Sequence, residues 1–74
     1  MNRARRMLTE LVEDTCEEIG FEFDEGCVEA VETLLFLNHG IKLSDQKVVT
    51  YNLIDKFEEE LENWKSATEE NYMW

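Results

Sequence analysis

Apolar residues recur every three or four positions along most of this chain, which is the spacing of one face of an α-helix. The first such segment covers about residues 2–19 and stops at Gly20, a residue type that ends helices in the left-handed conformation at low steric cost. At 100° per residue, its apolar and acidic positions fall on opposite arcs, so we predict an amphipathic helix. The apolar arc holds Ala4, Leu8, Leu11, Val12, Thr15 and Ile19, and the acidic arc holds Glu10, Glu13, Asp14, Glu17 and Glu18.

A second helix is predicted from Asp24 to about His39, just before Gly40. The Asp24 carboxylate can accept hydrogen bonds from the free N–H groups of the first turn. Between the two helices, Phe21 and Phe23 alternate with polar residues as in a β-strand, but the chain offers no second strand. We therefore predict a connector whose aromatic rings fill the core. The expected inner face of the second helix consists of Cys27, Val31, Leu34 and Leu35, widened by Val28, Ala30 and Leu37.

Ser44 has a side chain suited to an N-cap, and we predict that it opens a third helix running to about Ser66 or beyond. Part of the apolar stripe of this helix is spaced alternately by three and four residues, as in a coiled-coil seam. Residues 67–74 are treated as a short C-terminal tail whose closing aromatic cluster folds back on the core; the alternative is that the cluster docks on a partner. The stripe is Val49, Leu53, Ile54, Phe57, Leu61 and Trp64, and the cluster is Tyr72, Met73 and Trp74.

Together these segments predict one all-α domain over residues 1–74, a small three-helix bundle made of a helical hairpin plus a long third helix. An apolar fraction of 43% is too high for a disordered acidic tail. A chain of 74 residues is near the lower end of what folds alone. The predicted core is Leu8, Leu11, Ile19, Val31, Leu35, Phe57 and Leu61.

The formal net charge of −11 limits the classes of partner. Because nucleic acids and anionic membranes attract Lys and Arg, we expect neither as a direct partner. The longest apolar run, residues 34–37, is far shorter than a bilayer span. Glu10, Glu13 and Asp14 fall where a signal peptide would be apolar. We therefore expect a cytoplasmic protein.

The acidic residues are concentrated in a stretch that lacks cations. No Lys or Arg lies between Met7 and Ile41. If the first two helices pack as a hairpin, the carboxylates of this stretch form a contiguous anionic surface without compensating cations. The alternative is a solvated face that serves solubility alone. The ten carboxylates are Glu10, Glu13, Asp14, Glu17, Glu18, Glu22, Asp24, Glu25, Glu29 and Glu32.

Carboxylates spaced along helices can take the place of nucleic-acid phosphates. We therefore expect an acidic protein-binding module that occupies a basic, nucleic-acid-binding surface of a partner and inhibits or regulates it. In size and charge the chain resembles the small antagonists that viruses use against host nucleases, polymerases or defence complexes, which implies the host cytoplasm. The candidate partner-binding residues are Glu10, Glu13, Asp14, Glu17, Glu18, Glu25, Glu29, Glu32 and Phe36.

Phe36 falls on the acidic side of the second helix, where an aromatic ring inside a polar rim is typical of a binding anchor. The interpretation we favour is that the third helix or the tail covers Phe36. Val48 and Tyr51 present the same ambiguity on the third helix.

The second function considered is a homodimeric structural or adaptor protein. A small monomer with a seam-like stripe on its third helix favours association between copies. The candidate contacts are Ile54, Phe57, Leu61, Trp64, Tyr72 and Trp74.

No residue pattern predicts catalysis, a cofactor or a metal site, so we expect no enzyme. Cys16 and Cys27 lie eleven positions apart, which fits no metal or redox motif. We expect two buried thiols rather than a disulfide. His39 has no second His and no cysteine at ligand spacing, so we interpret it as a helix-end residue.

Overall fold

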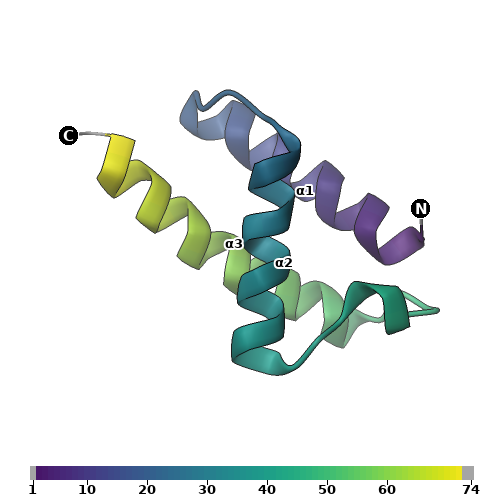
Figure 1. Ribbon diagram of the computed structural model, residues 1–74. Coiled ribbons are helices and arrows are strands. Elements are labelled where there is room, and N and C mark those ends of the chain that lie inside the picture. Colours follow the sequence, from purple (N-terminus) through teal and green to yellow (C-terminus); the bar gives the residue numbers. More distant parts are fainter. Residues whose placement is uncertain (1, 73–74) are drawn as a thin grey trace.

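The computed structural model describes the backbone of residues 2–72 and the side chains of residues 2–70. Within this part of the chain it contains three α-helices and no strand. The helices are α1 (Arg3–Ile19), α2 (Glu25–His39) and α3 (Tyr51–Tyr72), and a 3-10 turn, η1 (Leu43–Asp45), precedes α3. α1 and α3 run in the same direction, and α2 crosses both (Figure 1). The predicted all-α three-helix bundle is confirmed.

The first two helices begin and end where their local sequence signals place them. The Asn2 and Asp24 side chains each accept a hydrogen bond from the N–H three residues on, at 2.8 and 3.2 Å. Gly20 and Gly40 follow the two helices with φ of 72° and 67°, a conformation that costs other residues about 1–2 kcal/mol. The predicted Asp24 cap and the predicted helix ends at Gly20 and Gly40 are therefore confirmed, and the Asn2 cap is an additional finding.

The predicted start of the third helix is wrong. Ser44 lies in η1 rather than at a helix N-cap, and α3 begins at Tyr51. Thr50 is the residue that caps α3, because its Oγ1 accepts a hydrogen bond from the Leu53 N–H at 3.2 Å. The β-branched run at residues 48–50 is a poor helix former. In addition, the Leu43 side chain is buried, which fixes η1 against the core.

At its other end, α3 continues past Ser66, as the prediction allowed. The helix continues without a break to Tyr72 and so includes residues 67–72, which we had treated as tail. Residues 73–74 and the side chains of residues 71–72 lie outside the described part of the chain. The predicted docking or folding back of the terminal aromatic cluster therefore stays a prediction.

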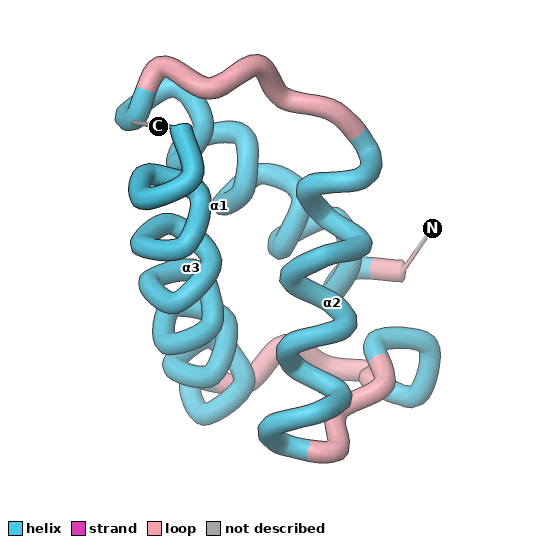
Figure 2. The backbone as a smooth tube through the Cα atoms, turned by 60° about the vertical axis from the view of Figure 1, so that its left-hand side comes forward, coloured by secondary structure: helices cyan, strands magenta, loops and turns pink. Residues whose placement is uncertain are grey.

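The core lies where α1 and α3 are crossed by α2, and α2 packs more extensively against α3 than against α1 (Figure 2). The connector prediction is confirmed. Phe21 and Phe23 are half-buried against the core, and the Phe21 ring meets Trp64 edge-on at a centroid distance of 6.2 Å. The buried apolar residues are Ala4, Leu8, Val12, Cys16, Cys27, Val28, Val31, Leu35, Leu43, Leu53, Phe57, Leu61 and Trp64.

Two members of the predicted core are only half-buried, namely Leu11 and Ile19. The buried residues of α1 are spaced by four positions and end at Cys16. The buried face is therefore rotated about the helix axis toward Cys16 and away from Leu11 and Ile19, relative to the predicted apolar arc. A row of residues with this spacing forms the ridge that packs into the groove of a neighbouring helix. Leu11 still packs at the edge of the core, whereas Ile19 is the last residue of α1.

Candidate functional site

The solvent face of α1 carries the acidic residues expected of it. All five of its predicted carboxylates are exposed. Four of them make no ion pair with any described residue, and we call these four the α1 acidic face. Since α1 buries its i, i+4 row on the opposite side, these carboxylates lie free in solvent without any cost of burial. The α1 acidic face is Glu10, Glu13, Asp14 and Glu17.

The expectation that the cation-free stretch lacks compensating cations is wrong for three carboxylates. Arg5 Nη2 lies 3.0 Å from Glu25 Oε2, and Arg5 Nη1 lies 3.3 Å from Glu32 Oε1. Lys65 Nζ lies 2.8 Å from Glu18 Oε1. Both cations come from outside the stretch and reach it only through the tertiary fold.

Lys65 and Arg5 connect different helices. The Lys65 pair joins α1 to α3 across 47 positions, and hydrogen bonding to Glu18 raises the pKa of Lys65. Arg5 instead bridges α1 to α2. Glu32 Oε1 is shielded from solvent and receives no hydrogen bond of good geometry, so Arg5 supports it by charge alone.

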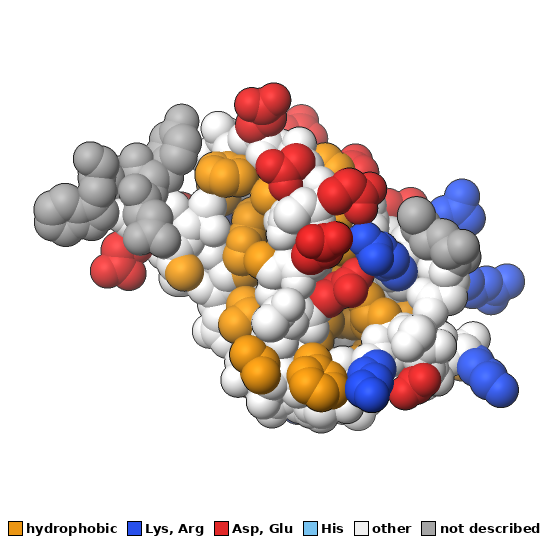
Figure 3. All heavy atoms as spheres, in the orientation of Figure 1, with side chains coloured by type: hydrophobic (Ala, Val, Ile, Leu, Met, Phe, Trp, Pro, Cys, Tyr) orange, Lys and Arg blue, Asp and Glu red, His pale blue; other side chains and the backbone are white. Residues whose placement is uncertain are grey.

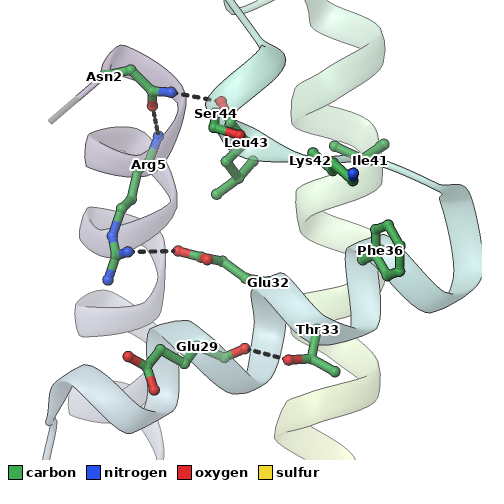
Figure 4. Close-up of a pocket in the computed structure, with 10 residues that line it drawn as sticks. All are labelled: Asn2, Arg5, Glu29, Glu32, Thr33, Phe36, Ile41, Lys42, Leu43 and Ser44. Carbon is green, nitrogen blue, oxygen red and sulfur yellow. Dashed lines mark hydrogen bonds and ion pairs between the residues drawn. The ribbon is translucent and has the colours of Figure 1, made fainter.

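An open groove of about 670 Å³ lies between the start of α1, the middle of α2 and η1 (Figure 4). The Asn2 side chain closes one wall, since its Nδ2 donates to the Leu43 carbonyl oxygen at 2.6 Å. The groove is lined by Asn2, Arg5, Glu29, Glu32, Thr33, Phe36, Ile41, Lys42, Leu43 and Ser44.

Neither α3 nor any other described helix covers Phe36, so the interpretation that we favoured for this residue is wrong. Phe36 is 48% exposed and lines the groove. Lys42 Nζ lies 5.7 Å from the Phe36 ring centroid. Val48 and Tyr51 are also exposed, at 67% and 89%. Because α3 starts late, residues 46–50 form a non-helical connection with a bend at Val48.

The solvent side of α2 is divided lengthwise into two strips. Carboxylate side chains follow one side of the helix and apolar side chains follow the other (Figure 3). Leu37, at 69% exposed, is the most accessible member of the apolar strip, and Glu29 makes no ion pair with a described residue. The acidic strip is Glu25, Glu29 and Glu32, and the apolar strip is Ala30, Leu34 and Leu37.

A buried carboxylate on α3 was missed by the sequence reasoning. Glu60 is 1% exposed and accepts hydrogen bonds from Asn38 Nδ2 at 2.9 and 3.1 Å and from His39 Nε2 at 3.1 Å. Asn63 Nδ2 contributes longer contacts of 3.3 and 3.4 Å. Burial by itself would raise the pKa of Glu60, but these hydrogen bonds outweigh burial and lower the pKa.

The signal for Glu60 was present in the helical spacing. Glu60 lies three positions after Phe57 and four before Trp64, both of which are buried. In the sequence it follows two glutamates, Glu58 and Glu59, that are both exposed. Because Glu60 ties the last turn of α2 to the middle of α3, we assign it a structural role. His39 is the last residue of α2, as predicted.

Cys16 and Cys27 are both buried and free, which confirms the expectation of two thiols. Burial, together with the neighbouring Cys27 thiol, raises the pKa of Cys16 to about 11. A thiol that resists ionisation is a poor nucleophile and a poor metal ligand. Within the described residues, no group of three His, Cys, Asp or Glu side chains could hold a metal ion.

The coiled-coil-like seam of α3 is used inside the monomer. Phe57, Leu61 and Trp64 are buried against α1 and α2, so a second copy of this fold could not reach them. Ile54 is half-buried. The side chain of Tyr72 and all of Trp74 lie outside the described residues, so a contact through them stays a prediction.

No protein-family model, curated protein or solved structure matches this chain. None of the helices within the described residues is both long and apolar enough to cross a membrane.

Proposed function

We propose that this protein is an acidic binding module that engages a basic, nucleic-acid-binding surface of a protein partner and blocks it. The observation that carries the proposal is the α1 acidic face, four exposed carboxylates on one side of one helix that make no ion pair with a described residue. Their side of α1 packs against nothing in the described chain. A partner can therefore approach α1 between Glu10 and Glu17 without displacing an intramolecular contact.

The spacing of these carboxylates supports a phosphate-like role. From Glu10 to Glu17 they are distributed at a mean spacing of about 3.5 Å along the helix axis. Phosphates along one strand of B-DNA follow at about one per 3.4 Å. A basic groove shaped for a nucleic-acid strand would thus meet a similar linear density of negative charge. The net charge of −11 adds long-range attraction, which accelerates association with a cationic surface.

The test uses two variants with the same change in charge. In the first, the α1 acidic face is neutralised by Glu10→Gln, Glu13→Gln, Asp14→Asn and Glu17→Gln. In the control, four exposed carboxylates of α3 are neutralised by Asp55→Asn, Glu58→Gln, Glu62→Gln and Glu69→Gln. Both variants gain four units of charge and replace three Glu and one Asp, so only the position of the charge differs.

Each immobilised protein is used to capture partners from cell lysate at 50 and 200 mM NaCl, with and without competing duplex DNA or RNA. We expect the wild type and the α3 control to retain a nucleic-acid-binding protein that the competitor releases. The α1 variant should retain at least about tenfold less, since each exposed charge pair contributes about 0.2–1 kcal/mol. Equal retention by the two variants would contradict the proposal.

A further inference from the structure

The apolar strip of α2 is a second exposed feature of this molecule. Ala30, Leu34 and Leu37 follow the spacing i, i+4, i+7, and they are half-buried or exposed rather than enclosed. This is the arrangement by which one helix packs its ridge along another. The strip spans about 10 Å, or two helical turns, so it fits a short partner helix.

Carboxylates border the strip. Glu25 and Glu29 are exposed on the acidic strip beside it, and Glu29 makes no ion pair with a described residue. On the α3 side, Glu59 is 56% exposed and its Oε2 lies 3.7 Å from His39 Nε2, at the end of the strip. An apolar ridge with acidic borders is complementary to a helix that has an apolar stripe with basic borders.

We infer that the apolar strip of α2 docks a basic amphipathic α-helix of the partner, with Leu37 as the main apolar contact and Glu29 as a charge contact. The inference rests on the proposed function and specifies the chemistry of the partner's surface. A second copy of this chain fits the strip poorly, because it would bring an equal net charge of −11 and the same acidic strip.

The groove on the acidic side of α2 adds a contact for one cation. Phe36 presents an exposed ring at the end of the acidic strip, and Lys42 Nζ already lies 5.7 Å from its centroid. An arginine of the docked helix would take the accessible part of this ring and approach Glu29 on the same wall of the groove. The inference thus assigns Phe36 a supporting contact at the edge of the docking site.

The probe is a fluorescein-labelled 18-residue peptide with leucines at i, i+4 and i+7 and Lys or Arg on its other faces. A scrambled peptide of the same composition and an acidic peptide with Glu at every Lys or Arg position serve as controls. Binding is measured by fluorescence anisotropy at 50 mM NaCl. We expect the amphipathic basic peptide to bind at least about tenfold more tightly than the scrambled one, and the acidic peptide not to bind.

Two variants locate the site. Leu37→Ala removes an apolar side chain that is 69% exposed, and Val48→Ala removes one that is 67% exposed elsewhere, so neither should disturb folding. We expect Leu37→Ala to weaken binding about fivefold to tenfold, consistent with loss of apolar burial, and Val48→Ala to change it less than twofold. Circular dichroism checks that both variants keep wild-type helicity.

The outcomes separate the two proposals. If the scrambled basic peptide binds as tightly as the amphipathic one, or Leu37→Ala has no effect, the docking inference is overturned while a charge-driven function stands. If neither basic peptide binds, the docking inference is overturned, whereas the proposed function is decided by the α1 and α3 charge variants. If sedimentation velocity shows a wild-type dimer that Leu37→Ala abolishes, the strip belongs to a second copy and the inference is also overturned.

Discussion

The buried carboxylate of Glu60 allows a quantitative test of how the fold is held together. In the substitution Glu60→Gln the side chain keeps its size but loses its charge and one of its two acceptor oxygens. The three donors that converge on it are Asn38, His39 and Asn63. At least one of them must then face the amide group of the new glutamine, which is itself a donor.

The magnitude follows from the two shortest contacts, at 2.9 Å from Asn38 and 3.1 Å from His39. Hydrogen bonds to a charged group contribute about 1.5–3 kcal/mol each, and the substituted amide would keep one weaker acceptor, so we expect a loss of about 2–3 kcal/mol. A domain of this size has a total stability of about 4–11 kcal/mol. The loss should lower the melting temperature by about 8–24 °C.

The assay is urea unfolding followed by circular dichroism at pH 7. With a slope of about 1 kcal/mol per molar urea, the midpoint of Glu60→Gln should fall by about 2 M. Glu59→Gln is the matched control, because Glu59 is the neighbouring glutamate and is 56% exposed; it should change stability by less than about 0.5 kcal/mol. Equal midpoints for the two variants would refute the assigned role of Glu60.

The stability difference between the wild type and Glu60→Gln should depend on pH. The pKa of Glu60 is lowered from its ordinary value of 4.5, so the ionised side chain stabilises the folded state. This contribution is fully present above pH 4.5 and is lost as the pH falls through the lower pKa of the folded state. The stability difference between wild type and Glu60→Gln should therefore shrink on acidification below pH 4.5. A difference that grows there would contradict the pKa direction.

The remaining predictions address the core, a helix end and the thiols. Phe57→Ala should destabilise the protein by about 3–5 kcal/mol, whereas Phe36→Ala, at a position 48% exposed, should cost less than about 1 kcal/mol in urea unfolding; similar costs would contradict the described core. Gly20→Ala should lower the unfolding free energy by about 1–2 kcal/mol because of the φ of 72°, and an unchanged midpoint would argue against this helix end. Cys16 and Cys27 should react with a thiol reagent at pH 8 only in denaturant, since both are buried and the pKa of Cys16 is about 11; fast native labelling would show that they are accessible.

Local signals were sufficient to predict α1 and α2. Their caps, Asn2 or Asp24 at the start and a glycine at the end, act within one or two turns of the helix itself. The start of α3 could not be found in this way. Ser44 has the right side chain for an N-cap, but the position of η1 is set by a hydrogen bond between Asn2 and Leu43, across 41 positions.

The sequence allowed the exposed carboxylates of α1 to be predicted, but not which carboxylates form ion pairs. The exposure of Glu10, Glu13, Asp14 and Glu17 follows from the amphipathic pattern of α1. The neutralisation of other carboxylates depends on Arg5 and Lys65, which only the tertiary fold brings to α2 and α1. Long side chains that reach across helices leave no periodic trace in a sequence.

The exposed state of Phe36 and the buried state of Glu60 have a common cause. The helical spacing places both residues at the edge of a face, where a small rotation or a shift of a neighbouring element decides burial. Because α3 begins at Tyr51, it leaves the Phe36 side of α2 open and brings Glu60 under the last turn of α2. In both cases the burial depends on where α3 begins and packs against α2, which the sequence pattern did not predict.

The most direct test of the proposed function is the affinity of the captured partner for three proteins at 50 and 200 mM NaCl. These are the wild type, the variant with a neutralised α1 acidic face, and the control with four neutral residues on α3. We predict that the α1 variant binds at least about tenfold more weakly than the other two at 50 mM NaCl and loses less affinity at 200 mM, because screening acts on the charges it lacks. Equal affinity and equal salt dependence for all three proteins would contradict the role assigned to this face.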